Sequence, residues 1–457
     1  METTPPFELS ALRRDWIDGL EGRLFYQRVL RRLYKVREAG IAAHRRGVLI
    51  AETDPVKFAA AFLAAVHLRR PVILANPRWG KQEWKELRQL VNPALIFGKT
   101  PLSTRKRKGP DNPGPSTILI PTGGSTGGVK LTVHRWSTLK AACDGLEEFM
   151  GEGPMHCCCV LPLFHVSGLM QLMRSFHTGG RIAFPDFDAL RVGRFPDFER
   201  NSLCISLVPT QLQRLLSRKR ATKKLSYARA VFMGGAPMPD SLAAEARKRQ
   251  IPIIMSYGMT ETAAMIVVQS PDEFLAGAPI AGYPLNHVQV EVIDEAGEAC
   301  HEGEHGRIRV SGRSLFKGYH GLKRLSLRHG FLTDDEGLFD AKGRLQVIGR
   351  ADRLIITGGE KVDPREVENA ILETGGAQEV LVIGWPHPDW GQQVVAFYTT
   401  GGVVSGEDEW GRELSAELAH YKIPKIIFRV PKLPLNSRGK LDHKSIEHLL
   451  SKEARIR

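Results

Sequence analysis

The sequence has few cysteines and no long apolar run, and these absences exclude several classes of protein. Among its six cysteines, Cys157, Cys158 and Cys159 are consecutive, and no two form a CxxC pair. We therefore expect neither a zinc site nor a dithiol site, but reduced, buried thiols in a cytoplasmic protein. No window approaches the roughly 20 apolar residues that a membrane span needs. The N-terminal residues METTPPFELSALRRDW also lack the basic and apolar segments of a secretory signal.

The chain is too long for one core and is strongly basic. Its 457 residues predict at least two domains, and 42% hydrophobic with 25% charged residues is typical of globular proteins. The net charge is +14, and the basic runs RKRK (105–108) and RKRATKK (218–224) lie far apart without interleaved aromatics. This pattern favours a solvated surface over a nucleic-acid interface, with attraction of small polyanions as the second interpretation.

Short apolar runs that end in Gly or Pro alternate with helical patterns. STILIP, CCCVLPLF, SLVPT, ARAVFMGGAP and IPIIMSYG are predicted strands, whereas TQLQRLLSRK and PDSLAAEARKR are predicted helices. This alternation predicts layered α/β structure.

A second domain is expected after about residue 350. In DPREVENAILE, Asp363 can cap a helix, Pro364 suits its first turn, and Glu366 stands where a capping box needs it. EVLVIGW reads as a strand. The expected apolar helix faces comprise Val367, Ala370 and Ile371, and later Leu414, Leu418 and Tyr421. We predict a large N-terminal domain of α/β subdomains (1–350) and a small α+β domain (353–457).

The stretch PTGGSTGGVK, residues 121–130, has the composition of a phosphate-binding loop. Its glycines let the backbone approach an anion, and its hydroxyls and Lys130 suit a phosphate. A P-loop would need Ser or Thr after the lysine, followed by a helix, but Leu131 follows here and VKLTVH is strand-like. We therefore predict a loop between two strands; a flexible turn without a ligand is the alternative.

Four further blocks offer groups that suit a nucleotide. In SYGMTET (256–262), Tyr257 can stack on a base and Glu261 offers oxygen ligands for magnesium. GGAP (234–237) leaves open backbone on which a flat ring can lie. The block 330–362 carries Asp335, Arg350, Asp352 and Lys361, and PLNSRGKLDH places Lys440 in a Gly-flanked loop.

These blocks, in this order over about residues 115–445, resemble the adenylate-forming superfamily of acyl-CoA ligases, luciferases and peptide-synthetase adenylation domains. The resemblance implies a large N-terminal domain and a small mobile C-terminal domain. It also implies that a carboxylic acid and ATP with Mg²⁺ form an acyl-adenylate, whose acyl group passes to a thiol such as that of CoA.

The resemblance implies a role for each matching residue. Thr122, Gly123, Gly124, Ser125, Thr126, Gly127 and Lys130 would hold the β- and γ-phosphates. Gly234, Gly235, Ala236, Tyr257 and Gly258 would surround the adenine, with the tyrosine ring stacked on it. Thr260 would meet the α-phosphate, Glu261 bind Mg²⁺, and Asp335 with Arg350 hold the ribose. Asp352 falls at the hinge, Lys440 at the adenylation lysine, and His165 at the mouth of the acyl pocket.

Three features depart from the family pattern. Gly124 stands where a serine is usual, and Asp334 replaces a common glycine. The region before residue 115 is shorter than in most relatives. None of these changes removes a charged catalytic group.

The acid is the least determined part of the reading. LPLFHVSGLMQLMRSFHTGGR and SLVPTQLQRLL resemble the 2-succinylbenzoate–CoA ligases of menaquinone and phylloquinone synthesis. Because that acid is a dicarboxylate, its second carboxylate needs a polar partner. The candidates are His165, Ser167, Thr210, Gln211 and Arg214.

Several alternatives stay open beside this reading. They are another aryl- or acyl-CoA ligase, an enzyme that loads a carrier-protein thiol, and a non-catalytic nucleotide-binding protein. The expected partners are a small carboxylic acid, ATP and CoA, without nucleic acid and without a membrane span. The sequence leaves the oligomeric state open, a homodimer included. His134, His177 and His301 receive no functional role.

Overall fold

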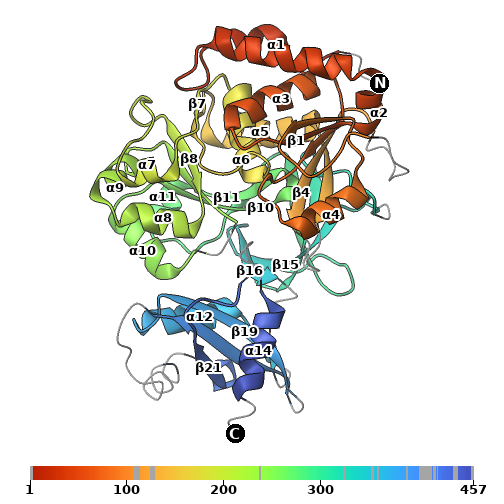
Figure 1. Cartoon of the computed structure of the whole chain (residues 1–457). Helices are drawn as coiled ribbons and strands as arrows, with labels where there is room; N and C mark the ends of the chain where they lie inside the picture. The colour runs from red at the N-terminus through yellow and green to blue at the C-terminus, as the bar shows by residue number, and fades with distance from the viewer. Residues whose placement is uncertain are drawn as a thin grey trace. The chain divides into compact units, whose positions relative to one another are not determined.

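The computed structural model describes residues 4–105, 114–123, 129–235, 238–322, 325–350, 355–357, 360–387, 390–400, 414, 418, 420–435 and 441–453. Contacts divide the chain into two compact units (Figure 1). The N-terminal unit comprises Met1–Met238, Leu242–Thr333 and Leu338–Val347, and the C-terminal unit comprises Pro239–Ser241, Asp334–Gly337 and Ile348–Arg457. The domain limits at 350 and 353 stay a prediction.

The first sheet of the N-terminal unit has the order β3-β1-β2-β4-β5. Its strands are β1 (Val48–Ala51), β2 (Val72–Leu74), β3 (Leu95–Gly98), β4 (Thr117–Gly123) and β5 (Val129–Arg135). Strands β1 to β4 are parallel, and β5 runs antiparallel to β4 with Thr122 opposite Lys130. The loop 121–130 therefore joins two strands, as predicted. The helices of this part are η1 (Leu9–Arg13), α1 (Gly22–Glu38), α2 (Gly40–Arg46), α3 (Pro55–His67), α4 (Lys81–Leu90) and α5 (Trp136–Met150).

The second sheet has the order β12-β11-β10-β9-β8-β6-β7. Its strands are β6 (His156–Cys158), β7 (Ile182–Ala183), β8 (Leu203–Leu207), β9 (Ala230–Met233), β10 (Ile253–Met259), β11 (Ala264–Gln269) and β12 (Tyr283–Pro284). Strands β7, β6, β8, β9 and β10 are parallel to one another, and β11 is antiparallel to β10. The accompanying helices are α6 (Val166–His177), α7 (Phe187–Arg191), α8 (Pro209–Leu216), α9 (Lys219–Leu225), α10 (Asp240–Lys248) and α11 (Pro271–Leu275), with η2 (Thr260–Thr262) after β10. The predicted strands and helices of this part are present, but the strand predicted over CCCVLPLF ends at Cys158 and the strand predicted over SLVPT ends at Leu207, because Pro209 opens α8.

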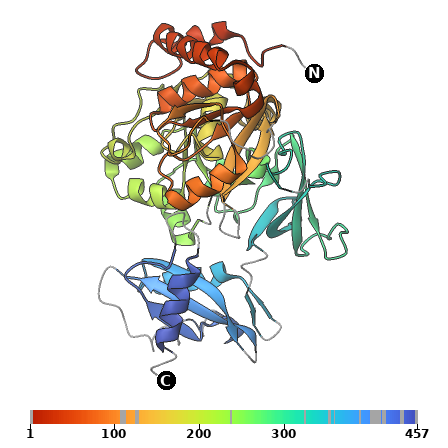
Figure 2. The same ribbon diagram turned by 45° about the vertical axis from the view of Figure 1, so that its right-hand side comes forward.

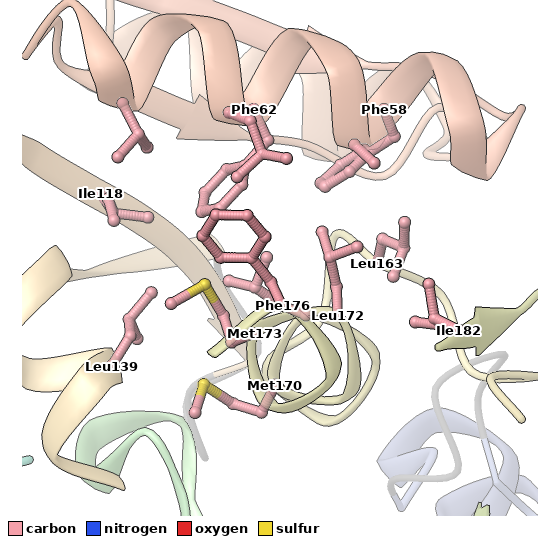
Figure 3. Close-up of a cluster of buried hydrophobic side chains, with 14 of the residues drawn as sticks. Phe58, Phe62, Ile118, Leu139, Leu163, Met170, Leu172, Met173, Phe176 and Ile182 are labelled. Atoms are coloured by element: carbon pink, nitrogen blue, oxygen red, sulfur yellow. The ribbon is translucent and has the colours of Figure 1, made fainter. Parts of the chain in front are cut away.

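The largest core cluster joins elements of both sheets. Figure 3 shows Phe58 and Phe62 of α3 facing Leu172 and Phe176 of α6. Helix α6 is buried almost throughout, from Gly168 to Phe176. The cysteine triplet is buried, as predicted, and burial raises the pKa of Cys159 to about 12. These thiols therefore act as small apolar groups rather than as nucleophiles.

A four-stranded sheet follows, in the order β13-β14-β15-β16, with β14 antiparallel to β13. Its strands are β13 (Val288–Ile293), β14 (Gly306–Gly312), β15 (Phe331–Phe339) and β16 (Leu345–Arg350). The C-terminal unit has a sheet of order β18-β17-β20-β19, with β21 beside β20. Its elements are β17 (Ile355–Thr357), β18 (Glu360–Val362), α12 (Pro364–Glu373), β19 (Glu379–His387), β20 (Gly391–Thr399), η3 (His420–Lys422), β21 (Ile426–Arg429) and α14 (His443–Glu453).

Helix α12 begins as predicted, with one correction. Asp363 accepts a hydrogen bond from the Arg365 N–H at 2.9 Å, and Pro364 opens the helix. The capping box expected from Glu366 is wrong, because its carboxylate bonds the Lys422 ammonium at 2.6 and 2.7 Å. The predicted apolar face (Val367, Ala370, Ile371) is buried with Leu414 and Leu418, and Tyr421 packs against it. Among the described helices, none has the length and apolar content to cross a bilayer.

Candidate active site

The carboxyl ends of the parallel strands of the second sheet supply most of the predicted site residues. In such sheets, ligands bind at the edge where parallel strands end. His165 and Ser167 follow β6, Thr210 and Gln211 follow β8, Gly234 and Gly235 follow β9, and Tyr257, Gly258, Thr260 and Glu261 lie at the end of β10. One edge of one sheet therefore carries groups predicted for the adenine, the α-phosphate, magnesium and the acid.

The Glu261 carboxylate is buried and held in place. Glu261 lies in η2, and the residue is only 7% exposed. The Tyr319 hydroxyl donates to its Oε1 at 2.7 Å, and the Phe316 N–H donates to its backbone oxygen at 2.8 Å. A carboxylate fixed in this way suits a hard divalent cation, because little ordering remains when the ion binds.

Tyr319 reaches Glu261 because the segment 316–320 lies along strand β5. The Lys317 N–H donates to the Val133 oxygen at 2.7 Å, and the Val133 N–H donates to the Gly318 oxygen at 2.9 Å. The Lys130 ammonium lies over the same ring, 5.6 Å from the Tyr319 centroid. Tyr319 thus connects the predicted phosphate lysine with the predicted magnesium ligand.

His134 holds the main chain at Thr260. The histidine is fully buried on β5, and its Nε2 lies 2.8 Å from the Thr260 carbonyl oxygen. Since a carbonyl can only accept, Nε2 carries the proton, and Nδ1 faces the Thr138 hydroxyl at 3.1 Å. Burial lowers the pKa of His134 to about 4, because the charged form loses its hydration. This neutral histidine joins β5 to the end of β10.

The backbone beyond Glu261 is strained. Ala263 and Ala264 have φ values of 57° and 83°, a region that residues with a Cβ seldom adopt. The pairing of β10 with β11 also shifts between Tyr257 and Gly258. A Cβ on Gly258 would lie 2.0 Å from the Ala264 oxygen, so no larger residue fits. Such strain and bulges gather at functional sites, where they aim particular side chains.

The two described glycines after β9 form a surface without side chains. A Cβ on Gly234 would lie 2.8 Å from the Ser256 Oγ, and Gly235 has a φ of +80°. The Ser256 hydroxyl donates to the Met233 oxygen at 2.8 Å, which joins β10 to β9. The open backbone next to Tyr257 is compatible with a flat ring.

The candidate acid-binding residues lie at the starts of two helices. His165 precedes α6 and is exposed, with its ring 4.7 Å from that of Phe164. Ser167 and Thr210 are exposed. The Gln211 Oε1 accepts from the Val208 N–H at 3.2 Å, so this side chain caps α8.

Arg214 lies one turn after Thr210 on α8 and is exposed. Its guanidinium can therefore approach an anion beside the Thr210 hydroxyl.

The remaining predicted residues lie elsewhere in the chain. Asp335 is half-buried on β15, and Arg350 ends the neighbouring strand β16. Thr122 and Gly123 end β4. Gly124, Ser125, Thr126, Gly127, Ala236, Asp352 and Lys440 lie outside the described residues.

Sequence reasoning missed three residues that shape this site. His134 received no role, and Tyr319 and Glu86 were not considered. Glu86 on α4 accepts from the Val129 N–H at 2.8 Å, at the base of the 121–130 loop. The only signal was the position of His134 in the strand that follows the loop, because the other two residues act from distant segments.

Comparisons with known proteins show the family of the chain. The model of the AMP-binding enzymes matches residues 102–320, and that of the AMP-binding enzyme C-terminal domain matches residues 366–440. A 2-succinylbenzoate–CoA ligase of Bacillus licheniformis is 35% identical over 337 residues, which cover 71% of this chain and 68% of the relative. That of Enterococcus faecalis is 32% identical over 332 residues, covering 71% and 67%.

Two solved structures share the fold. The o-succinylbenzoate CoA synthetase (MenE) of Bacillus subtilis, in complex with the acyl-adenylate intermediate OSB-AMP, has a TM-score of 0.79 at 24% identity, and 93% of each chain is covered. ATP-bound MatB of Rhodopseudomonas palustris has a TM-score of 0.82 at 23% identity, covering 98% of this chain and 97% of that one. The α/β fold with a large N-terminal AMP-binding domain and a small C-terminal domain is thereby confirmed. The chain belongs to the AMP-binding, adenylate-forming family of acid–CoA ligases.

Proposed function

We propose that this protein converts 2-succinylbenzoate, ATP and CoA into 2-succinylbenzoyl-CoA through an acyl-adenylate, in menaquinone or phylloquinone synthesis. The observation that carries the proposal is the buried Glu261 carboxylate, which Tyr319 holds at the end of β10 beside Thr260. The acid is taken from the relatives, since those of Bacillus licheniformis and Enterococcus faecalis are both 2-succinylbenzoate–CoA ligases.

The described residues fit ATP and Mg²⁺. MenE of Bacillus subtilis has been solved in complex with ATP and magnesium ion. In the present chain, the Glu261 carboxylate is the kind of oxygen donor that Mg²⁺ prefers, and the Thr260 hydroxyl would meet the α-phosphate. The ion, when bound, would neutralise phosphate charge as the α-phosphate is attacked. Lys130 adds a cation over the Tyr319 ring.

The nucleotide would use the groups at the strand ends. The loop from Thr122 to Lys130 would take the β- and γ-phosphates through its backbone N–H groups and hydroxyls. Gly234, Gly235 and Ala236 would form the surface under the adenine, with Tyr257 and Gly258 beside it. Asp335 would accept hydrogen bonds from the ribose hydroxyls, with Arg350 nearby.

The first half-reaction joins the acid to AMP. A carboxylate oxygen attacks the α-phosphorus, the bond to the bridging oxygen breaks, and pyrophosphate leaves. Lys440 would bridge the carboxylate and the α-phosphate, where negative charge meets negative charge. His165 would stand at the mouth of the acid pocket.

The second half-reaction transfers the acyl group to the thiol of CoA and releases AMP. It needs a different lining around the adenylate, with water excluded and the thiol admitted. Rotation of the C-terminal domain about Asp352 would exchange Lys440 for the face around Lys361.

The second carboxylate of 2-succinylbenzoate needs polar partners. Arg214 offers a cation, and Thr210 and Ser167 offer hydroxyls, all at helix starts or on the exposed face of α8. Gln211 can contribute only its amide N–H groups, because its Oε1 caps α8.

Pyrophosphate exchange across a panel of acids tests the proposal. We expect ATP–pyrophosphate exchange that depends on 2-succinylbenzoate, and CoA thioester formation when CoA is added. Exchange only with another aryl or fatty acid would refute the substrate. Product formation only with a carrier-protein thiol would refute CoA as acceptor, and no exchange with any acid would support a non-catalytic nucleotide-binding protein.

A further inference from the structure

Helices α1 and α2 form an outer layer of the N-terminal unit. Both views show α1 on the outside with α3 beneath it (Figures 1 and 2). The inner face of α1 is buried through Phe25, Val29, Leu33 and Val36. The opposite face, together with exposed residues of α2, faces solvent; we call it the α1–α2 face.

This face concentrates the positive charge of the chain. Residues 22–46 contain eight basic residues (Arg23, Arg28, Arg31, Arg32, Lys35, Arg37, Arg45 and Arg46) and one acid, Glu38. Eight minus one gives +7, which is half of the net charge of +14 carried by all 457 residues. Arg32 pairs with Glu52 at 3.2 Å and Arg46 bonds the Thr104 oxygen, whereas the other six basic residues are exposed.

Large apolar side chains share the face with these cations. Leu24 is 43% exposed, Leu30 40%, Tyr34 64% and Ile41 74%. Leu30 and Tyr34 lie one helical turn apart, so both project from the same side of α1. Contact with water accounts for the cations on this face, but it does not account for these four apolar side chains.

We propose that the α1–α2 face docks the protein on an anionic lipid bilayer. A helix whose outer face carries cations together with aliphatic or aromatic groups can bind lipid through both electrostatic attraction and apolar contact. The cations attract anionic headgroups, and the apolar side chains enter the interface. A nucleic acid would use the cations but leave the apolar groups in water. A second copy of this chain would bring two strongly basic faces together, which charge repulsion opposes.

Vesicle sedimentation with the purified full-length protein tests the proposal. Vesicles of phosphatidylcholine with one third phosphatidylglycerol should bind the protein at low salt, and raising the salt should release it. Vesicles of phosphatidylcholine alone should bind it far less.

Two variants separate the contributions of charge and apolar contact. The triple variant Arg28→Gln, Arg31→Gln, Lys35→Gln keeps helix-forming side chains and should weaken binding by roughly 100-fold. The variant Tyr34→Ser, Ile41→Ser keeps the charge and should also bind less. The matched control removes three exposed cations from α9, as Lys219→Gln, Arg220→Gln, Lys223→Gln, and should bind like the parent.

The outcomes are distinct from those that test the proposed function. Pyrophosphate exchange should be unchanged in all three variants, which shows that they are folded. Full exchange activity without binding to anionic vesicles would overturn this inference alone. Equal losses in the α1 and α9 triple variants would also overturn it, because any basic surface would then suffice. Binding of an acidic protein to this face, without binding to the vesicles, would assign the face to a protein partner instead.

Discussion

Replacing His134 should change how the stability of the protein depends on pH. The buried ring donates through Nε2 to the Thr260 carbonyl, and its pKa is lowered from 6.5 to about 4. A histidine with a lowered pKa binds its proton less readily in the folded than in the unfolded state. Its contribution to stability is therefore complete above the unfolded pKa and is lost as the pH falls from about 6.5 towards 4.

The magnitude follows from the gap between the two pKa values. One pKa unit corresponds to about 1.4 kcal/mol. At a pH below both pKa values, the free energy of unfolding is therefore lower by about 3 kcal/mol than at neutral pH. At about pH 5, between the two, the loss relative to pH 7 is about 2 kcal/mol.

Urea unfolding of the parent and of His134→Gln, each at about pH 7 and about pH 5, measures the contribution of His134 to the free energy of unfolding. A glutamine amide can still donate to the Thr260 oxygen but does not titrate. The fall in the free energy of unfolding between pH 7 and pH 5 should be about 2 kcal/mol smaller in the variant than in the parent. His287 is a useful internal constant, because its pKa is also lowered to about 4 and it is present in both proteins. Identical pH dependence in the two proteins would mean that His134 is not the buried, neutral donor described here.

Four further substitutions test the site. Lys440→Ala should lower acyl-adenylate formation by about 10²–10³ in rate but leave thiolysis of supplied acyl-adenylate intact; equal losses in both half-reactions would contradict its role. Asp352→Pro should separate the two half-reactions in single-turnover assays, and normal rates for both would reject the hinge. Tyr319→Phe removes the donor to Glu261 and should raise KM for ATP with Mg²⁺ roughly tenfold, with kcat less affected; an unchanged KM would remove Tyr319 from the site. Gly258→Ala places a Cβ against backbone oxygen and should lower the free energy of unfolding by about 1–3 kcal/mol in urea titrations, whereas parental stability would contradict the close approach.

The sequence by itself determined which elements form and in what order. Strands β4, β8, β9 and β10 and helices α8, α10 and α12 depend on apolar period and Gly/Pro punctuation, which act within a few residues. Neighbouring residues also distinguish the 121–130 stretch from a P-loop, because Leu131 follows Lys130 and the segment VKLTVH around this lysine is strand-like. The same dependence on nearby residues explains why one local inference was wrong. The capping-box spacing at Glu366 was present, but Lys422, distant in sequence, takes its carboxylate.

Only the tertiary structure decided how the site is held together. The bond from Tyr319 to Glu261 spans 58 residues, and the bond from His134 to Thr260 spans 126. No local pattern encodes such contacts, because they depend on which strands pair and on how the segment 316–320 runs along β5. The positive φ values of Ala263 and Ala264 likewise follow from the packing around η2 rather than from alanine's own preference. Local chemistry thus fixes which groups are available, and long-range packing fixes which of them meet.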